Sequence, residues 1–304
     1  MALLRWLEGV RFSPLTEFML LITHMGEETA FLVVAIVLFW CVNKKLGYYV
    51  MSVGFVGTTI NQFLKMTYRV ARPFELDTSF HAVKGALREA TGFSFPSGHT
   101  QASVGTFGSI AFATSKRWVR ILCLSLALLV PFSRLYLGVH TPLDVAVSFG
   151  VAVLLIILLY PFIYGGRSGK RMYALLGGML LLSFTYLLYV NMYQFPVNID
   201  SRRLASGIES SYTLLGALLG MLVVYIVDSG WLHFPVEAKW YMQIVKVIVG
   251  LALVLAVKAG LKTPLNALLG EPVGRMLRYF LVVFTAGVIW PMSFSWFSKV
   301  GVKE

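Results

Sequence analysis

Long uninterrupted apolar runs are the feature that most constrains how this chain can fold. The stretches AFLVVAIVLFWCV (30–42) and VAVSFGVAVLLIILLYPFI (145–163) approach the roughly 20 residues with which a helix crosses a hydrocarbon core of about 30 Å. Of the 304 residues, 58% are hydrophobic and only 13% are charged, whereas soluble domains carry about 25% charged residues. The sequence therefore predicts an all-α, polytopic membrane protein.

Hydrophobic periodicity and length divide most of the chain into membrane-spanning helices. About nine transmembrane helices are expected, at residues 27–43, 46–64, 97–114, 118–134, 142–164, 172–192, 210–228, 240–260 and 275–295. The apolar run that precedes them is broken by Arg5, Glu8 and Arg11, so residues 1–26 are predicted to form a segment that lies at the membrane interface.

Basic residues in short loops predict the orientation. With nine spans, four groups of Lys and Arg fall on one side, which is then cytoplasmic: Lys44 and Lys45; Lys116, Arg117 and Arg120; Arg167, Lys170 and Arg171; and Lys299 and Lys303. The net charge of +12 is dispersed among such loops. Contact with anionic membrane lipids explains it better than nucleic acid does, and no nucleic-acid partner is expected.

Three polar segments fall on the opposite, outer side in this topology. They are KMTYRVARP (65–73), FPSGHT (95–100) and SRLYLGVHTPLD (133–144). Separate segments that converge on one membrane face are what a single site requires, so we expect one site built from all three.

The first segment offers two cations. Lys65 and Arg72 are seven residues apart, about two helical turns, and share a face if the helix continues beyond its span. Two cations beside a membrane suit a ligand with several negative oxygens. Alternatively, both side chains only reach toward the membrane interface.

The second segment has the character of an anion site at a helix start. Pro96 and Ser97 fit a first helical turn, whose free N–H groups and positive dipole end attract anions. Gly98 lets a ligand approach the backbone, and His99 can give or take a proton near neutral pH. A simple helix cap with an incidental histidine remains the alternative.

The third segment couples a histidine to a carboxylate. Thr141 fits an N-cap, Pro142 a first helical residue and Asp144 the first turn. Asp144 is four residues past His140, so it can hold one imidazole nitrogen and leave the other free to act as a nucleophile. Arg134 adds further donors. Under the alternative reading, Asp144 only caps its helix.

Together these segments supply three cations, backbone donors, two histidines and one orienting carboxylate. The sequence offers no cluster of Asp, Glu, His or Cys with the spacing of a divalent-metal site, and neither a metal nor another cofactor is expected. The inventory indicates metal-independent phosphoryl transfer, in which cations hold the phosphate oxygens, one histidine attacks and the other protonates the leaving oxygen.

The set Lys65-x6-Arg72-Pro73, Pro96-Ser97-Gly98-His99 and Ser133-Arg134-x5-His140-x3-Asp144 resembles the three-part signature of the type 2 phosphatidic acid phosphatase superfamily (PAP2). The resemblance implies a helical core shared with vanadium haloperoxidases and bacterial acid phosphatases. It divides the chain into an interfacial segment (1–26), a catalytic core (27–164) and additional transmembrane helices (165–304) of unknown role.

The same resemblance assigns a role to each motif residue. His140 is expected to form a phosphohistidine, Asp144 to orient it, and His99 to be the acid for the leaving group. The residues expected to bind phosphate are Lys65, Arg72, Ser97, Gly98 and Arg134.

The layout, with one clear span before the lysine-bearing helix and four after the core, is similar to the glucose-6-phosphatase and sphingosine-phosphate phosphatase branches. The expected function is hydrolysis of a lipid phosphate monoester from the outer leaflet of a bacterial cytoplasmic membrane. Alternatives are a polyprenyl pyrophosphate or sugar-phosphate phosphatase, or a lipid transporter or scramblase that kept only the fold. The expected partners are the lipid substrate, membrane lipids and, as a candidate, a second copy of the chain.

Overall fold

The computed structural model describes residues 1–166 and 169–300, and every regular element in these ranges is a helix. The all-α prediction is therefore confirmed, while Arg167 and Lys303 of the basic groups lie outside the described residues. The chain forms two compact units. Unit 1 comprises Met1–Val34, Tyr49–Pro161 and Pro196–Ser206, and unit 2 comprises Ala35–Tyr48, Phe162–Phe195 and the chain from Gly207 onward.

The helices up to the end of the predicted catalytic core include several short ones. They are α1 (Ala2–Gly9), α2 (Ser13–His24), α3 (Glu28–Val37), η1 (Leu38–Val42), α4 (Lys44–Tyr68), α5 (Pro73–Leu76), α6 (Lys84–Leu87), α7 (Gly98–Ser103), η2 (Val104–Gly108), α8 (Ser109–Ala113), α9 (Arg117–Tyr136) and α10 (Pro142–Tyr164).

The remaining helices are α11 (Gly169–Met192), α12 (Ser201–Val227), η3 (Asp228–Leu232), α13 (Trp240–Gly260), α14 (Lys262–Leu269), α15 (Glu271–Phe284), η4 (Thr285–Ile289), η5 (Pro291–Ser293) and α16 (Phe294–Lys299).

Six helices of the described chain are long and apolar enough to cross a membrane, or seven if α2 and α3, bent by 55°, count as one span. The predicted count of nine is not confirmed. The predicted span 46–64 is helical, but it carries the polar residues Thr59, Asn61 and Gln62. The predicted span 97–114 is helical only over 98–113, about 24 Å of helix, which is shorter than a hydrocarbon core of about 30 Å.

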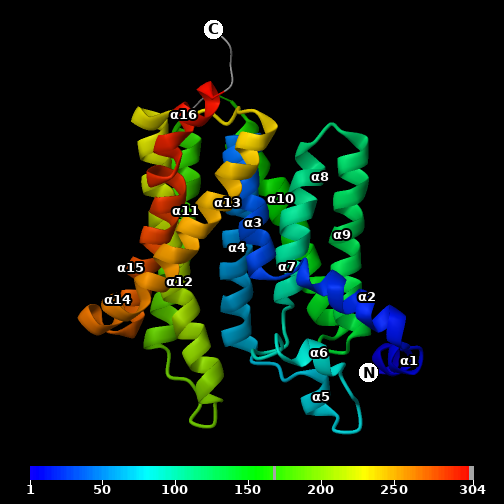
Figure 1. The fold of residues 1–304 in the computed structure, drawn as a ribbon. Coiled ribbons are helices and arrows are strands. Elements are labelled where there is room, and N and C mark those ends of the chain that lie inside the picture. The colour runs from blue at the N-terminus through cyan, green and yellow to red at the C-terminus, as the bar shows by residue number, and fades with distance from the viewer. Residues whose placement is uncertain (167–168, 301–304) are drawn as a thin grey trace. The chain divides into compact units, whose positions relative to one another are not determined.

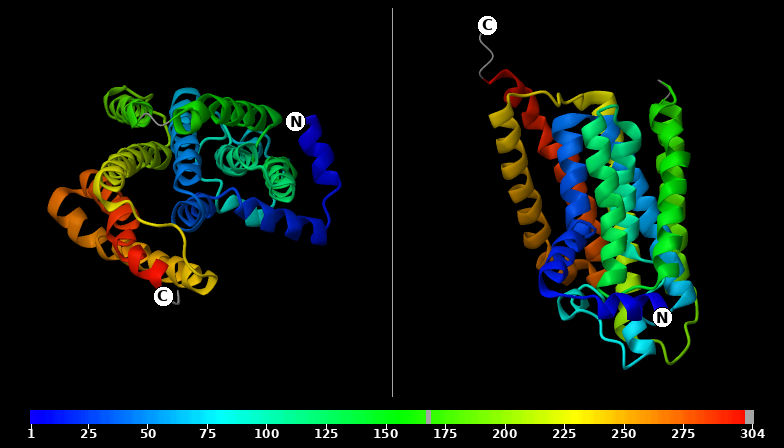
Figure 2. Two further views of the ribbon diagram at one scale, coloured as in Figure 1. Left: turned by 90° about the horizontal axis from the view of Figure 1, so that it is seen from above. Right: turned by 90° about the vertical axis from the view of Figure 1, so that its right-hand side faces the viewer.

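In unit 1, the continuous helix α7–η2–α8 turns back into α9, and the two pack side by side (Figures 1 and 2). The C-terminal ends of α4 and α9 and the N-terminal ends of α7 and α10 lie at the same end of the unit, beside α5 and α6 (Figure 1). Each predicted polar segment joins one of these helix ends. The structure thus gathers the three segments at one end of unit 1.

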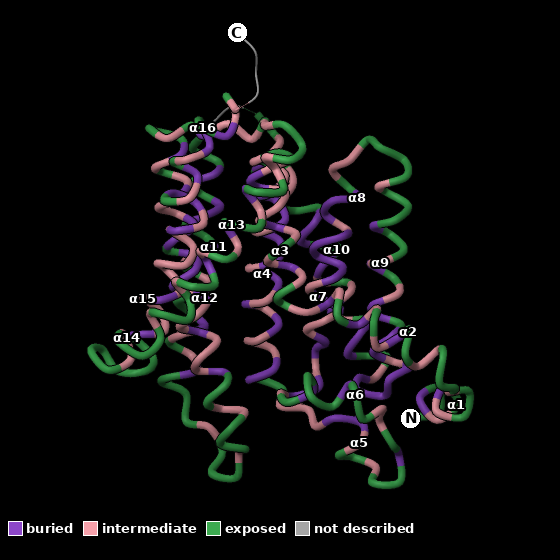
Figure 3. Tube along the Cα trace, in the orientation of Figure 1, coloured by how far each residue is buried: buried purple, intermediate pink, exposed green. Residues whose placement is uncertain are grey.

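Apolar residues remain exposed along the outer helices of unit 1, and Figure 3 shows exposed positions along α9. Ile121, Leu122 and Leu128 of α9 are more than half exposed, as are Leu154 and Ile157 of α10. Exposed apolar side chains in such numbers are costly in water and favourable in lipid. These faces are therefore suited to the acyl chains of a bilayer.

The N-terminal segment packs on the end of unit 1 that gathers the polar segments. Leu7 and Met19 join a buried cluster with Ala86, Tyr136 and Leu137. Polar contacts tie the same segment to the loop after α5 and to the end of α9: Arg5 Nη2 lies 2.7 Å from Asp77 Oδ2, and Arg11 Nε donates to the Tyr136 carbonyl at 2.9 Å. Residues 1–24 are thus integral to this end of the unit.

In unit 2, two glycines allow a close approach of α12 and α15. A Cβ atom at Gly216 would collide with the backbone of Met276, and one at Gly220 would lie 3.0 Å from the Phe280 carbonyl oxygen. Gly216 and Gly220 are four residues apart on one helix face, and such small-residue pairs are typical of close helix contacts in membranes. The glycines therefore set the distance between these two helices.

We expect Gly216→Ala to lower the free energy of unfolding by about 1–3 kcal/mol, because the added methyl group overpacks this contact. The measurement is thermal or denaturant unfolding in detergent. Gly177→Ala on α11 is the matched control, since nothing lies within 4 Å of its Cβ position. Equal stability of the two variants would contradict the prediction.

Candidate active site

The end of unit 1 described above holds a buried cluster of charged and polar side chains. Lys65, Arg72, Arg134, His140 and Asp144 come from all three predicted segments, and each is at most 9% exposed. Arg134, His140, Arg72 and Lys65 also lie close enough to His99 for their charges to act on it. Folding thus brings the predicted residues into one neighbourhood.

Arg72 reaches the cluster by a different route from the one predicted. Helix α4 ends at Tyr68, Arg69 adopts a left-handed backbone with φ of 50°, and Arg72 is extended with φ of −77° and ψ of 157°. The helix ends before Arg72, so the condition under which Lys65 and Arg72 would share a helix face is not met. The chain instead turns back, and the loop carries Arg72 toward Lys65.

Backbone carbonyls orient both cations. Arg72 Nε donates to the Gly92 carbonyl at 3.0 Å and Nη1 donates to the Val139 carbonyl at 2.9 Å. Lys65 Nζ donates to the carbonyl of Phe93. The loop before the second motif and the loop of the third motif therefore fix the positions of the cations of the first.

Asp144 lies at the start of α10, where it and Thr141 cap the helix reciprocally. The Thr141 N–H donates to Asp144 Oδ2 at 2.7 Å, and the Asp144 N–H donates to Thr141 Oγ1 at 3.2 Å. Ser94 Oγ donates to the same Oδ2 at 2.7 Å. His140 Nδ1 lies 3.5 Å from this oxygen, so Asp144 both caps the helix and faces the imidazole.

The second imidazole nitrogen faces a cation. His140 Nε2 lies 3.2 Å from Arg72 Nη1. A group held by Arg72 would therefore lie next to Nε2, while Nδ1 is directed toward the carboxylate. In this structure Nε2 therefore accepts from the Arg72 guanidinium, whereas Nδ1 makes no hydrogen bond among the described residues. A ligand that draws the guanidinium onto its own oxygens would free the lone pair of Nε2.

Arg134 is fully buried but only partly satisfied. Its Nη1 donates to Thr23 Oγ1 of α2 at 2.7 Å, whereas Nε and Nη2 have no partner among the described residues. Unpaired donors of a buried cation are costly. An anion at this position would supply the acceptors that they lack.

The second motif contributes a helix start with open space beside it. Ser97 caps α7, since its Oγ accepts from the Thr100 N–H at 3.3 Å, and its own N–H donates to the Asp144 carbonyl at 3.1 Å. No atom lies within 4 Å of the position that a Cβ at Gly98 would take. His99 Nε2 is buried and has no partner among the described residues. Gly98 and His99 therefore retain capacity for a ligand.

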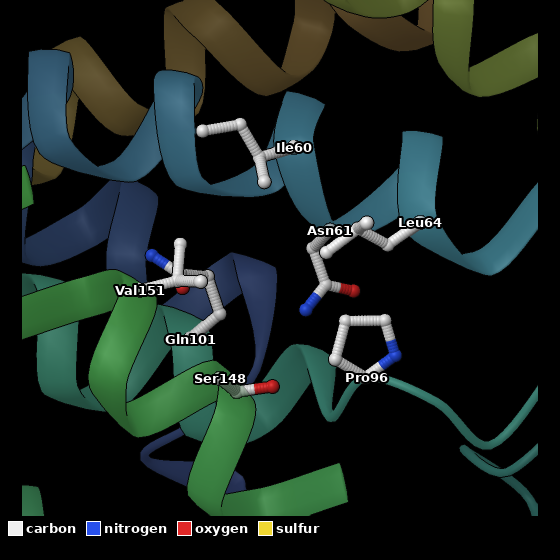
Figure 4. A pocket seen from close by; sticks show the side chains of 7 residues that line it. All are labelled: Ile60, Asn61, Leu64, Pro96, Gln101, Ser148 and Val151. Atoms are coloured by element: carbon white, nitrogen blue, oxygen red, sulfur yellow. The ribbon is translucent and has the colours of Figure 1, made fainter. Parts of the chain in front are cut away.

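A crevice adjoins the cluster between α4 and α10 (Figure 4). No water molecule fits into it as the side chains stand, so it is a narrow seam between the helices and not an open binding pocket. Figure 4 shows side chains of α4 facing α10 across this crevice. The residues that line it are Ile60, Asn61, Leu64, Pro96, Gln101, Ser148 and Val151. The Asn61 amide donates to the Ser97 carbonyl at 3.3 Å and Ser148 Oγ to the Asp144 carbonyl at 2.9 Å, so its polar walls support the second and third motifs.

Burial and like charges shift the titration of the loop residues. Burial lowers the pKa of Arg72 to about 10, at which the guanidinium stays charged at neutral pH. Burial, followed by the positive charges of Arg72, Arg134 and Lys65, holds the pKa of His140 well below its ordinary value. His140 is therefore neutral at pH 7, as a nucleophile requires.

Three residues in contact with the cluster were missed by sequence reasoning: Ser94, Thr23 and Asn61. Each is at most 4% exposed, and each donates to or accepts from a motif residue. Small polar residues are common in loops and helices, so their sequence positions carry no distinguishing signal. Among the described residues, no group of three or more His, Cys, Asp or Glu gathers as metal ligands would.

We predict that His140 makes the folded state sensitive to acid. As the pH falls below about 6.5, the unfolded chain binds a proton at this residue, while the folded protein resists it because the pKa of His140 is lowered. Stability attributable to His140 is therefore lost on acidification and unaffected at higher pH. When the pH is lowered from 8 to 5, the unfolding temperature of His140→Asn should therefore fall less than that of the unmodified chain. His81→Asn, at an exposed histidine, should keep the original pH dependence.

Comparison with known families and proteins bears on the identity of this cluster. The family model described as "PAP2 superfamily" matches residues 44–167, and the one described as "PAP2 superfamily phosphatase, transmembrane extension" matches residues 212–301. The first match contains all three motifs. No solved structure is significantly similar to the chain.

Three curated proteins are similar to part of the chain. An undecaprenyl-diphosphatase of Sulfolobus acidocaldarius is 29% identical over 44% of this chain and 64% of its own length, so the chain spans less than two thirds of that relative. An undecaprenyl-diphosphatase of Bacillus subtilis is 32% identical over 49% of this chain and 76% of its own length. Phosphatidylglycerophosphatase B of Bacillus subtilis is 29% identical over 50% of this chain and 77% of its own length.

These matches cover the motif-bearing core and the later helices separately, and they agree with the resemblance that the motif residues carry. The chain therefore belongs to the PAP2 superfamily, and its later helices match the transmembrane extension described for that superfamily.

Proposed function

We propose that the chain hydrolyses a phosphate group from a membrane lipid at the cluster in unit 1, through a phosphohistidine and without a metal ion. The observation that carries this proposal is the set of three buried cations beside the His140–Asp144 pair, with two donors of Arg134 unpaired. Burying three like charges is unfavourable unless an anion balances them. A phosphate group supplies that balance.

Lys65, Arg72 and Arg134 hold the phosphate oxygens in this proposal. Ser97 contributes through the helix start that it caps, and Gly98 through backbone that a ligand can approach. Charge develops on the phosphate oxygens as the reaction proceeds, and preorganised cations stabilise it without the cost of reorienting water. In metal-dependent phosphatases, a divalent metal ion provides this charge stabilisation.

His140 Nε2 attacks phosphorus in the first step. A nitrogen–phosphorus bond forms as the bond from phosphorus to the lipid oxygen breaks, and His99 gives a proton to that oxygen. Asp144 stabilises the positive charge that the imidazole acquires. A water molecule then attacks phosphorus, His99 takes its proton, the nitrogen–phosphorus bond breaks, and inorganic phosphate leaves with His140 restored.

The substrate is proposed to be lipid-linked. Apolar side chains of α9 and α10 stay exposed on the same unit, and a site at one end of a lipid-facing unit suits a substrate whose tail stays in the bilayer. The leading candidate is a lipid phosphate monoester. A polyprenyl diphosphate is the second candidate, and the names of two relatives favour it. The basic loops favour a site on the extracytoplasmic side of a bacterial cytoplasmic membrane.

The direct test is release of inorganic phosphate by the purified protein in detergent with EDTA present. The substrates are phosphatidic acid, sphingosine 1-phosphate, phosphatidylglycerol phosphate, undecaprenyl pyrophosphate and glucose 6-phosphate. We expect release from at least one lipid, with loss of at least about a thousand-fold in His140→Ala because the nucleophile is absent. Release that requires a metal, or that survives His140→Ala, would contradict the mechanism. Absence of release from every substrate by folded protein would favour the transporter alternative.

A second prediction concerns His99. His99→Asn should reduce hydrolysis of a lipid phosphate by about a hundred-fold or more, because an alkoxide leaving group needs a proton. Release of p-nitrophenolate from p-nitrophenyl phosphate in the first turnover should fall much less, since nitrophenolate leaves without one. Single-turnover rates of leaving-group release from both substrates give the comparison, because the later attack of water does not enter them. Equal losses for the two would remove His99 from the role of acid.

A further inference from the structure

Arg203 contacts the phosphate-binding end of unit 1 although it is distant in sequence from every motif. It lies near the start of α12, within the part of that helix that belongs to unit 1. The first family match ends at residue 167 and the second begins at residue 212, so Arg203 lies in the segment between the two matches. Its side chain is 15% exposed.

Arg203 makes two contacts with this end of the unit. Its Nη2 forms an ion pair with Glu75 Oε1, and its Cζ lies 5.0 Å from the centroid of the Phe93 ring. A guanidinium can pair with a carboxylate in its plane while its face covers an aromatic ring. Asp200, just before α12, makes a weaker approach, with Oδ2 at 3.9 Å from Arg203 Nε.

Both contacts lead to a cation of the site. The other oxygen of Glu75, Oε2, accepts from the Arg72 N–H at 2.8 Å. The carbonyl of Phe93 accepts from Lys65 Nζ, and the adjacent Gly92 carbonyl accepts from Arg72 Nε. Arg203 therefore joins the two segments that orient Lys65 and Arg72.

We propose that Arg203 is a positioning residue, which holds Lys65 and Arg72 in place through Glu75 and Phe93 without touching the substrate. This inference rests on the proposed function of the cluster. It gives the segment between the core and the transmembrane extension a part in phosphate binding. Displacement of binding groups by about 1 Å can cost up to a hundred-fold in rate.

The experiment compares Arg203→Ala with Arg202→Ala, in which the neighbouring arginine has an exposed side chain. Two quantities are measured on the best lipid substrate: kcat/KM, and the inhibition constant of inorganic phosphate. For Arg203→Ala we expect kcat/KM to fall by about ten-fold or more and the inhibition constant to rise. Arg203→Lys should recover part of both, and Arg202→Ala should match the unmodified chain.

The inhibition constant separates positioning from damage to folding. A variant that is inactive only because part of it is unfolded has a lower kcat, but its folded fraction binds phosphate as before. An unchanged inhibition constant in Arg203→Ala would therefore overturn the proposal. So would activity equal to that of Arg202→Ala.

A double-mutant cycle with Glu75→Gln separates positioning from direct contact. If Arg203 acts through Glu75, adding Arg203→Ala to Glu75→Gln should lower kcat/KM by less than it does alone. Equal losses in both backgrounds would show that Arg203 does not act through Glu75, and would overturn the proposal. An inactive unmodified chain would instead count against the proposed function, so the two failures are distinguishable.

Discussion

The carboxylate of Asp144 is the contact point around which the cluster is organised. Its Oδ2 accepts from Ser94 Oγ and from the Thr141 N–H, and it faces His140 Nδ1. Its backbone carbonyl accepts from the Ser97 N–H as well. One buried residue thus ties the loop before the second motif, the second motif itself and the third motif together. A buried carboxylate tolerates this position because its Oδ2 accepts two hydrogen bonds.

Positive charge imposes the second constraint. Lys65, Arg72 and Arg134 are buried close together, and backbone carbonyls accept one hydrogen bond from Lys65 Nζ and one each from Nε and Nη1 of Arg72. Such carbonyls carry only partial charge, so they reduce the mutual repulsion without cancelling it. Arg134 keeps two nitrogens without a partner among the described residues, so positive charge at this position is not compensated by the protein.

Residues from distant parts of the sequence contact this cluster or the residues beside it. Thr23 of α2 orients Arg134, and Arg203 of α12 contacts Glu75 and Phe93 beside Arg72 and Lys65. Neither residue lies within the match to the superfamily core. The motif residues perform the chemistry in the proposed mechanism, while these outer residues fix the geometry that the chemistry depends on.

The helical class, the family and the motif residues that form the buried cluster could all be predicted from the sequence, because apolar length and motif spacing are local properties of the chain. The sequence also predicted the contact of His140 with Asp144, which a separation of four residues in one helical start nearly dictates. It failed where the chain reverses: the end of α4 at Tyr68 and the return of Arg72 depend on the carbonyls of Gly92 and Val139. The contacts of Ser94, Thr23 and Arg203 become apparent only in the folded protein. Their partners lie far along the chain, and interactions between distant segments leave no periodic pattern in the sequence.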